Sequence, residues 1–161
     1  LDELAALPAA PGPKFVFAHI VSPHYPFVLG PDGEAIDDRE DTDARGYRDQ
    51  IRYLNKRLIP ILRSIIDESP VPPVILIQGD HGTGGPERKT KILSAYFLPR
   101  EGREMLYPSI SPVNSFRVVL NSVFGAGLDM LPDRALFSYA KTIYEFIEIE
   151  DVGACAAGSA P

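Results

Sequence analysis

The residue pair with the clearest chemical potential is Asp80-His81, which ends an apolar run and is followed at once by glycines. A carboxylate beside an imidazole is a donor set that holds divalent metal ions. Gly79 and Gly82 would let the backbone approach an ion or an oxyanion closely. Taken alone, the tripeptide Asp80-His81-Gly82 fits a polar turn at the end of a strand equally well.

Two further groups could contact an anionic substrate. His24 follows the apolar segment 15–21 and lies between two prolines that stiffen its loop. Arg88, Lys89 and Lys91 come shortly after the glycines, where a cation could neutralise a sulfate or phosphate oxygen. A solvated basic turn explains Arg88 and Lys89 as readily.

These side chains need a scaffold that brings them together. Segments 15–21, 74–78 and 92–98 are rich in apolar residues, and Val74 to Ile77 is continuously apolar, which is typical of buried parallel strands. Apolar residues three and four apart from 46 to 67 predict a helix between the first two. Strand, helix and strand in that order imply a right-handed crossover, so we expect His24, Asp80 and His81 at one edge of the sheet. The predicted fold class is a three-layer αβα fold with a mainly parallel sheet.

The remaining segments complete this picture. Ser111-Pro112 and Gly125 have the residue types that start and end a helix. Its expected apolar face comprises Val113, Phe116, Leu120, Val123 and Phe124. Residues 142–150 read as an edge strand, and His19 reads as a core histidine within the first strand. The connection 27–45 is rich in Asp and Glu but lacks the spacing of an EF-hand, so we expect a solvated loop.

The pattern Phe17-Ala-His-Ile-Val-Ser-Pro-His24-Tyr-Pro-Phe27, followed by a crossover helix and Gly79-Asp80-His81-Gly82, resembles the sulfatase and alkaline phosphatase superfamily. It is similar in particular to the sulfatase-like domains of bacterial membrane-anchored proteins, including lipoteichoic-acid-synthase-like enzymes. Segments 91–99 and 107–117 resemble those domains too. The resemblance implies that Asp80 and His81 are metal ligands and that His24 contacts a sulfate- or phosphate-ester substrate.

The resemblance also implies what these 161 residues lack. No segment matches the nucleophile motif of the superfamily, and Cys155 lacks the Pro and Arg spacing of a formylglycine cysteine. We therefore expect residues 14–150 to be the carboxyl-terminal part of a sulfatase-like domain, with 1–13 a linker and 151–161 a disordered tail. The amino-terminal half of the domain would then be its partner, the parent protein would be membrane-anchored and extracytoplasmic, and the isolated chain would be inactive.

The types of the donor atoms reduce the number of candidate metal ions. One imidazole with carboxylates favours zinc or manganese, while magnesium and calcium remain open. A second hypothesis is a non-catalytic α/β binding module, because this chain supplies few ligands for a tight metal site.

Composition limits the partners. A length of 161 residues with 45% hydrophobic content allows one core of ordinary size. The net charge of −6 argues against nucleic acid as a partner. No run of eighteen apolar residues is present in the sequence, as a membrane-spanning helix would need. We also expect an exposed sheet edge, through which the chain self-associates.

Overall fold

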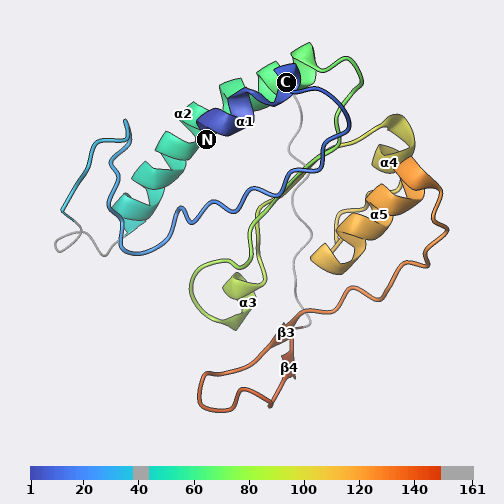
Figure 1. The fold of residues 1–161 in the computed structure, drawn as a ribbon. Helices are drawn as coiled ribbons and strands as arrows, with labels where there is room; N and C mark the ends of the chain where they lie inside the picture. The colour runs from blue at the N-terminus through green and yellow to red at the C-terminus, as the bar shows by residue number, and fades with distance from the viewer. Residues whose placement is uncertain (38–43, 150–161) are drawn as a thin grey trace. The chain divides into compact units, whose positions relative to one another are not determined.

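The computed structural model describes residues 1–37 and 44–149 and divides into two compact units, Leu1–Pro72 and Pro73–Pro161. The ribbon is shown in Figure 1. Helices dominate, and the strands are short, so the chain is of mixed α/β class.

The first unit is built on one long helix, α2 (Ala44–Glu68), which the apolar spacing predicted and which continues through Pro60. The short helices α1 (Asp2–Ala5) and η1 (Leu7–Ala9, a 3-10 helix) pack against α2. An ion pair between Asp2 and Arg57 joins α1 to α2. Phe27 is buried in the same unit, edge-on to Tyr47 with 6.3 Å between ring centroids.

The predicted strand at 15–21 is wrong. The structure assigns no strand to these residues, and the Phe15 and Phe17 side chains are 85% and 83% exposed. His19 is exposed as well, so it is not a core histidine. The physical reason is that an apolar run favours a strand only if its backbone finds hydrogen-bonding partners. No described segment pairs with 15–21.

The second unit begins with a β-hairpin. Strands β1 (Ile75–Gln78) and β2 (Ser94–Phe97) pair antiparallel, with Ile75 opposite Phe97 and Gln78 opposite Ser94. Both strands were predicted, but the mainly parallel three-layer sheet was wrong: the described strands form two antiparallel sheets of two strands each. A parallel pair needs a long crossover between its strands, whereas the connection 79–93 folds on itself and returns directly beside β1.

Two helices and a small hydrophobic core follow the hairpin. Helix α4 (Arg100–Glu104) contacts α5 (Pro112–Phe124), and Leu98 and Val118 are buried beside them. The predicted ends of α5 are confirmed. Ser111 is extended at its N-cap, Pro112 opens the first turn, and Gly125 closes the helix in the left-handed region at φ 63°.

The expected apolar face of α5 is wrong. Its five residues are all exposed, whereas the buried positions are Asn114, Ser115 and Val118. Burial of Asn114 and Ser115 is tolerated because both side chains form hydrogen bonds within this unit.

The last described elements are two very short strands. β3 (Leu136–Phe137) and β4 (Ile147–Glu148) pair antiparallel, so the strand predicted at 142–150 forms over two residues only. Arg134 donates two hydrogen bonds, of 2.8 and 2.7 Å, to the Glu148 carboxylate. The predicted disordered tail 151–161 and part of the acidic connection, residues 38–43, lie outside the described residues. Among the described helices, none combines the length and the apolarity that crossing a bilayer requires.

Candidate functional site

The loop between β1 and β2, residues 79–93, carries four of the five predicted site residues. The Gly79 backbone N–H donates to the Leu93 carbonyl at 2.9 Å and extends the strand pairing by one step. The Gly82 N–H then donates to the Lys89 carbonyl at 2.8 Å. This second bond folds the loop across itself, so the segment with Asp80 and His81 lies against the segment with Arg88 and Lys89.

Asp80 and His81 form a compact donor pair on this loop. The His81 backbone N–H donates to Asp80 Oδ1 at 2.9 Å. His81 Nδ1 lies 2.8 Å from the Gly82 carbonyl oxygen, which can only accept, so Nδ1 is the donor of this contact, and in the neutral imidazole Nε2 then presents a lone pair. Nε2 lies 3.7 Å from Asp80 Oδ2, and the two side chains are 50% and 89% exposed.

This spacing suits two ligands of one metal ion. Ligand atoms about 2.0–2.2 Å from a tetrahedral ion lie about 3.3–3.6 Å apart. The separation of 3.7 Å between Nε2 and Oδ2 is close to that range. A proton on Nδ1 held by a backbone carbonyl is also the usual support of a metal-binding histidine. The pair alone is incomplete, because the described residues hold no group of three or more His, Cys, Asp or Glu placed to bind a metal.

A short helix supports the cationic side of the loop. Gly85 caps α3 (Pro86–Lys89), and its carbonyl accepts hydrogen bonds from the backbone N–H groups of Arg88 and Lys89 at 3.0 and 2.9 Å. Arg88 is exposed and Lys89 is half-buried. Gly84 adopts φ 96°, a left-handed conformation that favours glycine, as the chain turns into α3. One loop therefore holds a metal-type donor pair and three cations, Arg88, Lys89 and Lys91.

His24 belongs to the other unit. It is exposed, and its Nδ1 contacts the Tyr25 carbonyl. The segment around it is tied to α2 by Ser22 Oγ, which donates to Oε1 of the buried Gln50 at 3.0 Å. The crevice that His24 was expected to share with Asp80 and His81 therefore stays a prediction.

Sequence reasoning missed an extensive polar network in the described part of the second unit. Asp133 accepts hydrogen bonds from Tyr107 Oη at 2.5 Å, from Ser111 N at 2.7 Å and Oγ at 2.5 Å, and from Asn114 Nδ2 at 3.1 Å. Asn114, fully buried, also exchanges two hydrogen bonds with the backbone of Leu131, at 2.8 and 2.9 Å. The network fixes the start of α5 to residues 131–133. Neither periodicity nor a motif around Asp133 signals it.

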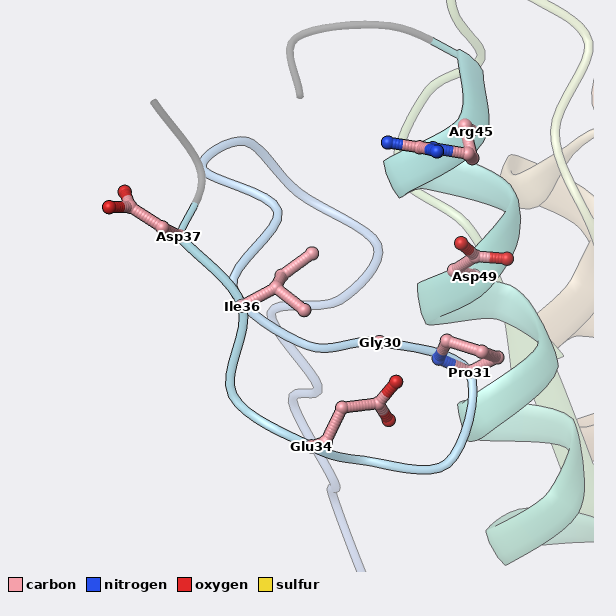
Figure 2. A pocket seen from close by; sticks show the side chains of 7 residues that line it. All are labelled: Gly30, Pro31, Glu34, Ile36, Asp37, Arg45 and Asp49. Carbon is pink, nitrogen blue, oxygen red and sulfur yellow. The ribbon is translucent and has the colours of Figure 1, made fainter. Parts of the chain in front are cut away.

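The structure also contains a pocket that the sequence did not predict, shown in Figure 2. Its volume is about 240 Å³, and it lies between α2 and the loop before it. In Figure 2, Arg45 and Asp49 project from α2 toward the loop with Glu34, whereas Asp37 points away. The lining residues are Gly30, Pro31, Glu34, Ile36, Asp37, Arg45 and Asp49.

The acidic side chains of this pocket are engaged within the protein. Asp49 pairs with Arg52 at 3.1 Å, and Glu34 accepts the backbone N–H of Asp32 at 2.9 Å. No predicted site residue lines the pocket. The hairpin loop is therefore the better candidate for chemistry.

Comparison with known proteins adds no relative: no protein-family model, curated protein or solved structure matches this chain. The resemblance to the sulfatase and alkaline phosphatase superfamily remains an interpretation of the sequence.

Proposed function

We propose that this chain is part of a metal-dependent, sulfatase-like hydrolase or transferase that acts on sulfate or phosphate esters. The observation that carries the proposal is the Asp80–His81 pair. Its Nε2 and Oδ2 atoms lie 3.7 Å apart, both side chains are exposed, and a proton on Nδ1 leaves Nε2 open to a metal. Zinc and manganese suit this donor pair best, with magnesium and calcium as alternatives.

Each residue then has a chemical role. A bound divalent ion would polarise the ester oxygen and lower the pKa of an attacking hydroxyl. Asp80 and His81 hold that ion. Arg88 and Lys89, on the same loop, neutralise the remaining sulfate or phosphate oxygens. His24 stabilises or protonates a substrate oxygen.

The proposal requires further residues of the same domain. By resemblance the nucleophile is a Ser or Thr outside these 161 residues, and so is another acidic ligand. The large exposed apolar side chains support a missing partner surface: Phe17 is 83% exposed and Phe116 is 54% exposed. Exposed apolar side chains of this size suit a surface that the rest of a domain or a second copy covers. The membrane-anchored, extracytoplasmic location of the parent protein rests on the resemblance alone.

The test measures metal content and ester hydrolysis in the isolated chain and in the parent protein. We expect the chain to bind Zn²⁺ or Mn²⁺ weakly and to cleave neither aryl sulfate nor aryl phosphate esters. Asp80→Ala or His81→Ala should abolish metal binding in both proteins, with Asp129→Ala, an exposed aspartate elsewhere, as the matched control. In the parent, His24→Ala should lower turnover about 100-fold with the metal retained.

Two outcomes would contradict the proposal. Robust turnover by the isolated chain would place the nucleophile within these residues, and a fully active Asp80→Ala parent would remove Asp80 from the site. A parent that binds no metal and cleaves no ester would favour the non-catalytic binding module.

A further inference from the structure

The first unit carries a row of cations along one face of α2. Arg45, Arg48, Arg52, Lys56 and Arg63 follow the helical period, so they fall within an arc of about 80° at 100° per residue. From Arg45 to Arg63 the row extends about 27 Å along the helix axis. We call these five residues the basic stripe.

The stripe faces solvent. All five residues are exposed, and the Arg52 and Lys56 side chains are 70% and 63% accessible. Arg52 pairs with Asp49 at 3.1 Å and Lys56 with Asp32 at 2.6 Å. The Asp49 side chain is only 17% accessible, whereas both members of the Lys56–Asp32 pair are exposed. Exposed pairs hold weakly, so a denser array of anions can displace Asp32 from Lys56.

One apolar residue lies within the stripe. Ile59 projects between Lys56 and Arg63 on the same arc, and it is 46% exposed. An exposed isoleucine between cations suits a surface that offers anions and hydrocarbon at similar depth. Such a surface is a lipid bilayer with anionic headgroups.

We propose that the basic stripe of α2 binds the surface of a bilayer that contains anionic phospholipids. The cations contact headgroup phosphates, and Ile59 enters the interfacial region. A row of cations on one side of a 25-residue helix matches a flat charged surface. The net charge of −6 keeps the other faces away from that surface, so binding is oriented as well as local.

Nucleic acid fits the stripe less well. A phosphate backbone would bind the cations, but it provides no apolar surface against which Ile59 could be buried. The stripe also contains no aromatic side chain on which bases could stack.

Flotation on a density gradient tests the proposal, because protein aggregates do not float. The 161-residue chain should float with vesicles of phosphatidylglycerol and phosphatidylcholine and not with phosphatidylcholine alone. Binding should fall steeply between 0.1 M and 1 M salt, as the screening length shrinks from about 10 Å to about 3 Å.

Substitutions then locate the contact. Arg48→Gln, Lys56→Gln and Arg63→Gln together should weaken partitioning about 100-fold, at roughly one cation's contribution each. Ile59→Gln should weaken it about fivefold. Arg100→Gln, Arg103→Gln and Lys141→Gln together remove the same charge from exposed positions of the second unit and should leave partitioning within about twofold. Circular dichroism checks that each variant keeps its helix, since glutamine is a good helix former.

Three results would overturn the proposal. These are equal flotation with neutral vesicles, equal losses in the stripe and control triple variants, and tighter binding of the chain to a DNA duplex than to the anionic vesicles.

Discussion

The Tyr107 hydroxyl donates a hydrogen bond to Asp133 Oδ2 at 2.5 Å. The bond joins the segment before α5 to the segment after it. Burial of the Asp133 carboxyl raises its pKa, but the hydrogen bonds from Ser111, Tyr107 and Asn114 outweigh burial, so the pKa is lower than usual. Burial, aided by the bond to Asp133, raises the pKa of the Tyr107 hydroxyl.

These shifts predict how stability depends on pH. Because the pKa of Asp133 is lowered on folding, its stabilisation is present above its unfolded pKa of about 3.9 and is lost as the pH falls through the folded value. Because the pKa of Tyr107 is raised, its stabilisation is present below about pH 10 and is lost as the pH rises through the folded value. Urea unfolding followed by circular dichroism should give a plateau between these limits.

Asp133→Asn should lower the free energy of unfolding of the second unit by about 2 kcal/mol at pH 7, since the amide cannot accept all the donors that now converge on the carboxylate. The acid limb of the stability profile should also flatten. Asp129→Asn is the matched control, because the contact that the structure describes for Asp129 is a hydrogen bond from Arg117 to its backbone carbonyl. An unchanged acid limb in Asp133→Asn would assign the pH dependence to another carboxyl.

The helices were the most predictable part of the fold. The three-and-four spacing of apolar residues locates α2, and the residue types at Ser111, Pro112 and Gly125 locate the ends of α5, because both signals are local. The inward face of α5 was not predictable in this way. It is decided by Asn114, whose amide is satisfied by Leu131, seventeen residues away.

The pairing of the strands could not be predicted from the sequence pattern. Apolar runs located β1 and β2, but the direction of their pairing depends on the path of the connection between them. This path is shaped by the hydrogen bond from Gly82 to Lys89, which the apolar pattern does not predict. The same holds for the candidate site: its residue types could be read from the sequence, but its folded arrangement could not. The types of Asp80 and His81 indicated a metal pair, and the predicted strands already placed Arg88 and Lys89 in the same connection. The bond from Gly82 to Lys89 that folds this connection back on itself appears only in the structure.

Gly82 should be the most sensitive backbone position of this loop. A Cβ at Gly82 would collide with the Arg88 carbonyl oxygen and lie 2.5 Å from that of Lys91. Both are backbone atoms that cannot rotate away. Gly82→Ala should therefore weaken Zn²⁺ binding by the chain more than tenfold, a loss of about 1.4 kcal/mol. Titration calorimetry measures this directly.

Gly85→Ala is the control for that experiment. Nothing lies within 4 Å of a Cβ at Gly85, and its φ of −72° suits any residue. Metal affinity should stay within about twofold of the wild type, since alanine adds no strain at such a position. Equal losses in both variants would mean that the loop merely tolerates no substitution.

Gln50 should control the position of His24. Its buried Oε1 accepts the Ser22 hydroxyl, and this bond holds the His24 segment against α2. Gln50→Ala should lower the stability of the first unit by about 1 kcal/mol and increase the mobility of residues 22–27, which amide exchange detects. Asn55→Ala, an exposed change on the same helix, should do neither. Unaltered exchange at 22–27 in Gln50→Ala would show that the segment is held by other contacts.

Arg88 and Lys89 provide the last prediction, which separates substrate binding from metal binding. If they neutralise sulfate or phosphate oxygens, Arg88→Gln and Lys89→Gln in the parent protein should raise KM for an aryl ester about tenfold each, since a charge-assisted hydrogen bond contributes about 1.5 kcal/mol or more. Metal content should not change, because Asp80 and His81 are untouched. Arg100→Gln, at an exposed arginine outside the loop, is the control and should leave KM unchanged. A fall in metal content in either variant would instead give these side chains a structural role in shaping the loop.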